Sequence, residues 1–335
     1  MSGPVFRWGL SSPAGIAVEF TRSIRTTSSA EVVAVASRDL GRAKAFADEH
    51  DIGSAYGSLA DMAASPDIDG VYICSPVHAH AAAVDVVAAA GNAILIEKPF
   101  AVSAAEAEAM FATAKQHGVF LMEAMWTRFL PAWQQIRALV DGGRIGEIRA
   151  ASASFGFSLI GGPRDEFLLD GAKGGGSLLE IGVYAAQFLQ GYLGTPTRVE
   201  ATVTESAKGA DLDVAASLFF GDRIATLQSS LTQLLPSSAS LSCTFGIIHV
   251  PPFFHAARRF EIFTLDGDAA RPFSVELVAA EPELGPLAYQ AIHVAERIAQ
   301  GETESDVMGP EDTVATLRII EAIREAGRSR HTSDS

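Results

Sequence analysis

The sequence has little cysteine, little positive charge and no long apolar run, and each shortage argues against a class of protein. Only Cys74 and Cys243 are cysteines among 335 residues. Two thiols are too few for a disulfide scaffold and give no metal-ligand spacing, so we expect both to be buried and reduced. No apolar run approaches the roughly 18 residues of a membrane-spanning helix. The first residues lack an apolar signal core, so we expect a cytoplasmic protein without a membrane partner.

Basic residues are outnumbered, with 25 Lys and Arg against 40 Asp and Glu and a formal net charge of −15. This balance argues against broad binding to nucleic acid or to anionic membranes. An anionic cofactor would therefore need a local cationic pocket.

The first third of the chain alternates apolar strands with helices. We predict strands at 5–10, 31–36, 70–74, 93–96 and 119–122, and helices at 42–50, 81–90 and 104–117. Such alternation implies right-handed βαβ units, and so an α/β fold with a doubly wound parallel sheet. The pattern alone leaves open an α/β domain that binds no nucleotide.

Glu97-Lys98-Pro99 directly follows the apolar run 93–96. Ligands bind at the carboxyl edge of open parallel sheets, so this strand delivers a carboxylate and an ammonium to the binding edge. Pro99 fixes its own φ and biases Lys98 toward an extended backbone. The alternative is a surface ion pair beside a turn.

The loop after the first strand lacks two of the glycines that usually cradle a dinucleotide. The matching stretch is Ser12-Pro13-Ala14-Gly15-Ile16-Ala17, whereas the usual pattern is G-x-G-x-x-G/A. Hydroxyls of Ser11 and Ser12 are possible donors to a phosphate. At the end of the second strand, Ser37 and Arg38 stand where an acidic residue would bind the ribose of NAD. A guanidinium suits a 2′-phosphate, which favours NADP over NAD; the alternative is a solvated loop arginine.

The chain changes character from about residue 147. We predict strands at 148–157, 197–204, 211–220, 223–230, 260–264 and 273–277, helices at 178–189, 287–300 and 311–326, and a frayed polar tail from 327. Closely spaced strands with few helices between them indicate a mostly antiparallel sheet, open on one face or paired across a dimer.

Three glycines, Gly174 to Gly176, precede a helix that carries Glu180 and Tyr184 at i and i+4. Glycines permit close approach of the backbone to a ligand, and this spacing places a carboxylate and a phenol on one helix face. The alternative is an ordinary helix start followed by an interfacial tyrosine.

Together these segments resemble the glucose–fructose oxidoreductase/inositol dehydrogenase/MocA (Gfo/Idh/MocA) family over nearly the whole chain. The sequences of residues 126–128 and 181–184 are most similar to its dimeric dihydrodiol dehydrogenase and NADP-dependent D-xylose dehydrogenase branch. The motifs are Arg7-Trp8-Gly9-Leu10, Ser37-Arg38-Asp39, Ser75-Pro76-Val77-His78-Ala79-His80, Glu97-Lys98-Pro99-Phe100, Met122-Glu123-Ala124-Met125-Trp126-Thr127-Arg128-Phe129 and Gly174 to Tyr184.

The resemblance implies an N-terminal Rossmann domain at 1–124 and a C-terminal substrate and dimerisation domain at 125–328. The polar end of the chain, 329–335, is expected to be a disordered tail. The resemblance implies a homodimer, or a dimer of dimers, through the open sheet. It also implies NADP, or NAD, as cofactor and hydride transfer to or from a hydroxyl-bearing carbon of a small molecule. The implied cofactor-binding positions are Ser11, Ser12, Ala14, Ile16, Ser37, Arg38, Ser75, Pro76, His80, Glu97, Lys98, Trp126 and Arg128.

The same resemblance implies catalytic roles for Lys98, Tyr184 and Glu180. Lys98 would hydrogen-bond the reacting oxygen and Tyr184 would give or take the proton. An ordinary phenol, with a pKa of about 10, is a poor base at neutral pH, and a neighbouring ammonium favours its phenolate form.

Two further departures from the family pattern accompany the degraded loop. Glu180 stands where relatives commonly have Asp, and a lysine usual before a later strand is absent from 243–246. We expect some of Phe155, Phe157, Phe253 and Phe254 to line the substrate pocket and at least half to be core.

Two other functions stay open on the sequence. One is a sensor that binds a nucleotide or sugar without turnover, and the other is an enzyme that uses transient oxidation to cleave a glycoside.

Overall fold

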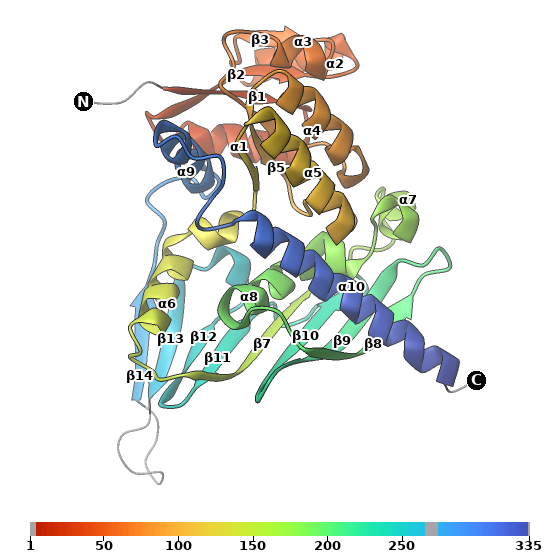
Figure 1. Cartoon of the computed structure of the whole chain (residues 1–335), viewed down its shortest axis with the longest axis vertical. Coiled ribbons are helices and arrows are strands. Elements are labelled where there is room, and N and C mark those ends of the chain that lie inside the picture. Colours follow the sequence, from red (N-terminus) through yellow and green to blue (C-terminus); the bar gives the residue numbers. More distant parts are fainter. Residues whose placement is uncertain (1–4, 265–273, 334–335) are drawn as a thin grey trace. The chain divides into compact units, whose positions relative to one another are not determined.

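The computed structural model describes the backbone of residues 5–264 and 274–333, with side chains to 328. These residues form two compact units (Figure 1). Among the described residues, the first unit contains 5–129 and 283–313, and the second contains 130–264, 274–282 and 314–333. Compactness therefore groups a late segment with the N-terminal unit. Our single functional boundary after residue 124 stays a prediction.

The first unit is built on a six-stranded sheet with the order β3-β2-β1-β4-β5-β6, in which every pair is parallel. Its strands are β1 (Phe6–Leu10), β2 (Ala30–Ala36), β3 (Ser54–Tyr56), β4 (Gly70–Ile73), β5 (Ala93–Ile96) and β6 (Leu121–Glu123). Its helices are α1 (Gly15–Ile24), α2 (Leu40–Glu49), α3 (Leu59–Ala63), η1 (Val77–Ala79), α4 (His80–Ala89), α5 (Ala104–His117), η2 (Trp126–Phe129) and α9 (Ala288–Ala299).

Local sequence sets the ends of these helices. Asp39 caps α2 by accepting hydrogen bonds from the N–H groups of Gly41 and Arg42. Ser103 caps α5 through the N–H of Glu106, and Gly118 ends that helix at φ +66°. The four residues of β5 are all buried, as expected for a central parallel strand. The chain therefore leaves the sheet at a fixed point, directly before Glu97.

The second unit is built on an eight-stranded sheet with the order β14-β13-β12-β11-β7-β10-β9-β8. Only β7 and β10 pair in parallel within this sheet, and the other described pairs are antiparallel. Its strands are β7 (Ile148–Gly156), β8 (Arg198–Glu205), β9 (Asp211–Phe220), β10 (Arg223–Ser230), β11 (Ala239–Cys243), β12 (Gly246–Val250), β13 (Arg259–Thr264) and β14 (Ser274–Ala279).

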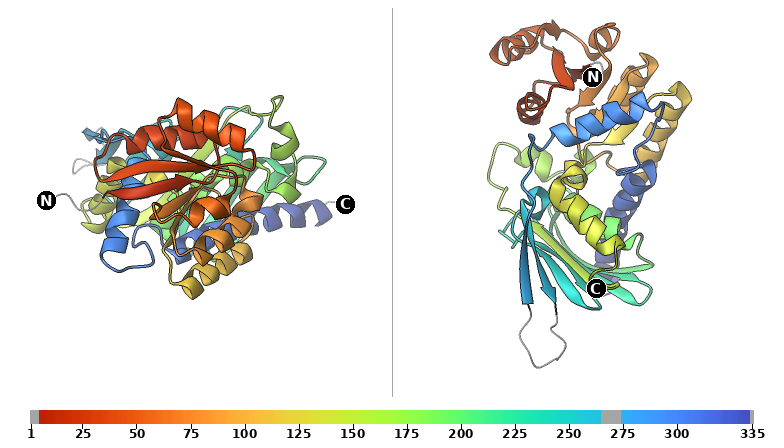
Figure 2. Two further views of the ribbon diagram at one scale, coloured as in Figure 1. Left: turned by 90° about the horizontal axis from the view of Figure 1, so that it is seen from above. Right: turned by 90° about the vertical axis from the view of Figure 1, so that its left-hand side faces the viewer.

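Helices of the second unit gather on one face of that sheet in the described part of the chain (Figure 2). They are α6 (Pro131–Asp141), α7 (Asp165–Leu168), η3 (Gly171–Lys173), η4 (Leu178–Gly182), α8 (Val183–Leu193), η5 (Phe254–Ala256) and the greater part of α10 (Pro310–Ser333). α8 packs against β7 and β10, and ten of its eleven residues are buried. It therefore forms the centre of this core.

The α/β class, with a doubly wound parallel sheet and a mostly antiparallel open sheet, is confirmed. The elements α1, β3, α3, α6, α7, β11 and β12 were not predicted. We predicted a disordered tail at 329–335, where the backbone stays helical to Ser333; residue 273 of the last predicted strand and residues 334–335 lie outside the described residues.

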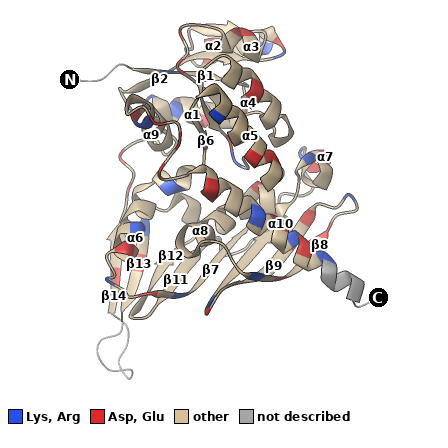
Figure 3. Ribbon diagram, viewed as in Figure 1, with Lys and Arg blue, Asp and Glu red and all other residues tan. Residues whose placement is uncertain are grey.

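Charged residues of both signs alternate over the helices and loops of each unit (Figure 3). None of the described helices combines the length and apolar composition that a bilayer crossing needs.

Candidate active site

The turn after β5 presents Lys98 at the carboxyl edge of the parallel sheet. Glu97 is 7% exposed and accepts a hydrogen bond from the N–H of Lys98 at 3.1 Å and another from the Tyr72 hydroxyl. The Lys98–Pro99 peptide bond is cis. Lys98 itself is half-buried. The carboxylate of Glu97 therefore stabilises the backbone of this turn.

Phe100 anchors the far side of the turn. Its side chain is fully buried and stacks on Phe111 with ring centroids 4.6 Å apart. Its carbonyl lies 3.0 Å from Nδ1 of His80, whose Nε2 lies 2.8 Å from the carbonyl of Ser75. Burial lowers the pKa of His80, and the two carbonyl contacts oppose that shift. Both ring nitrogens of His80, a predicted cofactor contact, thus face backbone carbonyls.

Glu123, at the end of β6, binds the same turn from the other side. It is 2% exposed and accepts the N–H of Phe100 at 3.2 Å and the Thr313 hydroxyl at 3.0 Å. Burial raises the pKa of Glu123 to about 7. Our sequence reading included Glu123 in a motif without giving it a role.

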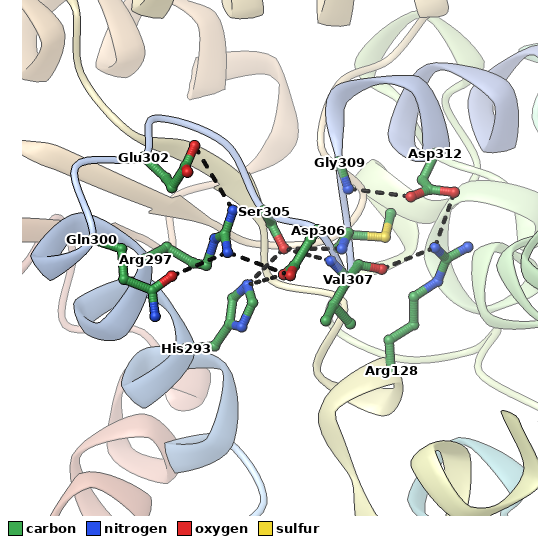
Figure 4. A network of polar contacts seen from close by, with 11 residues as sticks. Arg128, His293, Arg297, Gln300, Glu302, Ser305, Asp306, Val307, Gly309 and Asp312 are labelled. Carbon is green, nitrogen blue, oxygen red and sulfur yellow. Dashed lines mark hydrogen bonds and ion pairs between the residues drawn. The ribbon is translucent and has the colours of Figure 1, made fainter. Parts of the chain in front are cut away.

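Arg128, another predicted cofactor contact, is buried in a polar network of the first unit (Figure 4). Its guanidinium lies 3.2 Å from the Asp312 carboxylate and donates to the Val307 carbonyl at 3.3 Å. Trp126, on the same turn η2, is half-buried. The Arg128 side chain therefore ties η2 to the first turn of α10 and to the segment that precedes it.

The loop after β1 leads into the open N-terminus of α1. Its N-cap residue Ala14 has no side-chain cap, and the first turn holds no acidic residue. A Cβ at Gly15 would meet no atom within 4 Å, so the first residue of α1 borders open space. Because helix N-termini favour anions, this geometry fits a pyrophosphate even without the usual glycines.

Serine side chains line the neighbouring strand ends. The Ser11 hydroxyl accepts the N–H of Cys74 at 2.9 Å and also lies 3.9 Å from Sγ of Cys74. Among the described residues, Ser75 Oγ is buried without a hydrogen-bond partner. Cys74 is free and buried, and burial raises its pKa to about 12, which makes it an inert thiol. Cys243 is also free but only half-buried.

Arg38 lies at the end of β2, where the adenosine ribose is bound in dinucleotide folds. The neighbouring Asp39 carboxylate is occupied by the cap of α2. The Ser37 hydroxyl accepts the N–H of Asp39 at 3.2 Å. Arg38 is exposed and makes no ion pair to another described residue. This edge therefore offers a guanidinium and no uncommitted carboxylate beside it.

The second unit holds Glu180 and Tyr184 on a helix that starts at the glycine run. A Cβ at Gly175 would lie 2.2 Å from the Phe167 carbonyl, and Gly176 has φ +114°. The buried Asp211 accepts the N–H of Leu178 at 2.6 Å and the Ser177 hydroxyl at 2.9 Å. Arg324, on α10, donates to the other oxygen of Asp211 at 2.7 Å. The glycines therefore allow the close packing on which this helix start depends.

Glu180 lies in a π-helical turn, η4, that the sequence did not reveal. Arg164 binds it through two parallel hydrogen bonds of 2.8 and 3.0 Å. Such a bidentate pair fixes the orientation of the carboxylate. π-helical turns recur at functional sites.

Aromatic rings surround Tyr184, which is 6% exposed. Phe155 and His255 pack on it with ring centroids 5.6 and 5.0 Å away. Phe155 and Phe254 are buried, whereas Phe157 is half-buried and Phe253 is 54% exposed. The prediction that at least half of the four phenylalanines are core is therefore consistent with the burial. His255 was missed because it is a single imidazole in no motif.

Comparison with known proteins identifies the family. The oxidoreductase family with an NAD-binding Rossmann fold, Gfo/Idh/MocA, matches residues 14–125, and its C-terminal domain matches 133–249. A trans-1,2-dihydrobenzene-1,2-diol dehydrogenase from Homo sapiens is 36% identical over 329 residues, or 96% of each chain. The chain belongs to the Gfo/Idh/MocA family. It is therefore an NAD(P)-dependent oxidoreductase.

Solved structures of similar fold carry both cofactors. A 3-ketoreductase from Actinomadura kijaniata, solved with NADP and TDP-benzene, has 25% identity and a TM-score of 0.81, covering 97% of this chain and 98% of its own. An oxidoreductase from Agrobacterium radiobacter, solved with NAD+ and L-tartaric acid, has 21% identity and a TM-score of 0.80, covering 96% of each chain. Family membership thus indicates a nicotinamide dinucleotide, and the choice between NADP and NAD depends on the residues of this chain.

Proposed function

We propose that this enzyme is an NADP-preferring dehydrogenase or reductase that acts on a hydroxyl-bearing ring carbon, with a cyclic dihydrodiol favoured over a sugar or cyclitol. The observation that carries the cofactor preference is the end of β2. Arg38 is exposed there, and Asp39 is committed to capping α2. A carboxylate at this place would hold the 2′-hydroxyl of NAD, whereas a guanidinium binds a 2′-phosphate.

The remaining cofactor contacts follow from the strand ends and the turn of η2. The open N-terminus of α1 at Ala14 and Ile16 suits the pyrophosphate, with hydroxyls from Ser11 and Ser12 beside it. Other members of the predicted set at the edge of the sheet are Ser75, Pro76, Glu97, Lys98 and Trp126. His80 and Arg128 act behind them, because their polar atoms bind the protein itself.

Proton handling is assigned to Lys98 and Tyr184. A nicotinamide held at this edge of the sheet would supply the hydride-transfer chemistry. When the alcohol is oxidised, its O–H proton passes to the Tyr184 phenolate oxygen while the carbonyl forms, and Lys98 donates a hydrogen bond to the same substrate oxygen. Reduction reverses each transfer. Solved structures of the A. kijaniata ketoreductase include one lysine-to-alanine and one tyrosine-to-phenylalanine variant. A lysine and a tyrosine were therefore also chosen for substitution in that enzyme.

Glu180 is proposed to orient the substrate, with Arg164 holding its carboxylate. The partly exposed rings of Phe157 and Phe253 stack with centroids 6.2 Å apart and offer apolar surface in the same unit as Tyr184. Such surface suits an unsaturated carbocycle better than a polyhydroxylated sugar. The curated relatives at 32 to 36% identity are dehydrogenases of trans-1,2-dihydrobenzene-1,2-diol, hereafter the diol probe.

A homodimer, or a dimer of dimers, is proposed through the open face of the eight-stranded sheet. On β10 the exposed positions are Ile224, Thr226 and Gln228, which alternate with buried residues. One apolar residue among small polar ones suits a flat interface between sheets.

Titration of NADPH and NADH by nicotinamide fluorescence tests the cofactor preference. We expect NADPH to bind the wild type more tightly, and Arg38→Ala to weaken NADPH about 10- to 100-fold with little change for NADH, because it removes a charge-assisted phosphate contact. Arg22→Ala is the matched control, since Arg22 lies at the opposite end of α1 and pairs with Glu19. Equal weakening of both nucleotides by Arg38→Ala would contradict the preference.

A further inference from the structure

We propose that Glu123 is a positioning residue for Lys98, acting through the backbone of Phe100 to hold the turn that presents the lysine. The proposal rests on the proposed role of Lys98. Within the described part of the chain, the hydrogen bonds of the Glu123 carboxylate go to Phe100 and Thr313, neither of which we place on the substrate. Its effect on the reaction must therefore pass through the 97–100 turn.

The turn is held by two buried carboxylates, one on each side of Lys98. Glu97 accepts the N–H of Lys98 at 3.1 Å, and Glu123 accepts the N–H of Phe100 at 3.2 Å. The described pairing of β5 with β4 and β6 ends at Ile96, so Lys98 and Pro99 lie beyond the ladder of the sheet. Charge-assisted hydrogen bonds of this kind are roughly twice as strong as neutral ones. Loss of one anchor would let the turn shift.

Phe100 transmits this restraint because its N–H, its carbonyl and its ring each have a partner. Glu123 binds its N–H, His80 lies at its carbonyl, and Phe111 stacks on its ring. Thr313, in the first turn of α10, binds the second oxygen of Glu123 at 3.0 Å. The carboxylate therefore spans two elements of the same unit, and its orientation is set by both.

Charged groups around Glu123 come from each neighbouring element. Arg128 on η2 favours the ionised form and is itself paired with Asp312 of α10, whereas Glu97, which binds Tyr72 of β4, opposes it. Burial is the largest influence and raises the pKa of Glu123 to about 7. Protonation would replace the charge-assisted bond to Phe100 with a weaker neutral one. The restraint on the turn is thus expected to change near neutral pH.

An amide titration detects this restraint without catalysis. The full-length protein is labelled with ¹⁵N-phenylalanine, and the Phe100 signal is assigned by its loss in Phe100→Leu. We expect the chemical shift of the Phe100 amide proton to change in one step near neutral pH in the wild type, as Glu123 titrates. The step should be absent in Glu123→Gln. Thr313→Val removes the bond that favours ionisation, so it should move the step to higher pH. If Glu123→Gln does not fold, the shift in Thr313→Val decides.

Kinetics on the diol probe link the turn to the reaction. We expect Glu123→Gln to lower kcat about tenfold near pH 8 with KM within about twofold, because a displaced catalytic group loses transition-state stabilisation. An unchanged kcat, or a Phe100 amide that does not titrate, would overturn the proposal. Lys98→Met separates the two claims: if it keeps wild-type turnover, the role of Lys98 fails, whereas the Phe100 titration still reports on Glu123.

Discussion

Single residues behind the Lys98 turn carry the most unusual chemistry of the first unit. Glu123 and His80 are both nearly inaccessible to solvent. Burial raises the pKa of Glu123 and lowers the pKa of His80, because it disfavours the charged form of each. Sequence reasoning found Lys98 because strand ends at a parallel sheet are binding positions. It could not assign His80 or Glu123 to the protein interior, since both contact the backbone of Phe100, 20 and 23 residues away, and Glu123 also binds the Thr313 hydroxyl, 190 residues away.

Stability against pH should reveal the buried Glu123. Its pKa in the folded protein, about 7, lies above its ordinary value of 4.5. The folded state therefore holds the proton more tightly, and this contribution to stability is full below about pH 4.5 and lost as pH rises through about 7. The free energy of unfolding of the wild type, relative to Glu123→Gln, should fall by on the order of 3 kcal/mol between about pH 5 and pH 8. Urea unfolding at both values measures it, and a constant difference would contradict the burial of an ionisable Glu123.

The helix of Glu180 and Tyr184 shows what an element needs beyond its own sequence. Gly174 to Gly176 and the i, i+4 spacing were enough to predict a helix start with two functional side chains. The π-helical turn, the Asp211 cap and the Arg164 pair depend on residues 16 to 34 positions away, so no local pattern contains them.

Breaking the Asp211–Arg324 pair should destabilise this element. Arg324→Met would leave the 1%-exposed Asp211 without its cation, at a cost of roughly 3–5 kcal/mol. Asp211→Asn in the same chain should recover part of that loss, because the amide needs no counter-ion. Thermal unfolding of the wild type and the single and double variants measures this. A single variant as stable as the wild type would show that the helix start does not depend on the pair.

At the scale of the whole molecule, alternation of strands and helices predicted the parallel sheet, and dense strands predicted the antiparallel one. The sequence could not show that Glu283–Thr313 groups with the first unit. The amphipathic pattern of α9 predicts a buried face but does not identify the element that covers it. In the structure α9 contacts α1, and Gly285 donates its N–H to the Thr26 hydroxyl at 2.8 Å.

The proposed dimer also belongs to this scale. Light scattering after size exclusion should give at least twice the 35.2 kDa chain mass. Ile224→Glu, which places a charge on the exposed face of β10, should shift the protein toward monomer without loss of fold, because buried unpaired charges are costly at interfaces. Arg22→Glu, in the other unit, is the control. A monomeric wild type would contradict the interface.

The most direct test of the account is oxidation of the diol probe, followed by nicotinamide absorbance with NADP+ and with NAD+. We predict turnover with preference for NADP+, and a loss of about 10²–10⁴-fold in kcat for Tyr184→Phe while NADPH binding persists, because the phenol handles the proton and not the cofactor. Tyr184→Phe with wild-type turnover would contradict the proposed chemistry. A wild type that binds NADPH but oxidises no diol, sugar or cyclitol would instead favour a sensor.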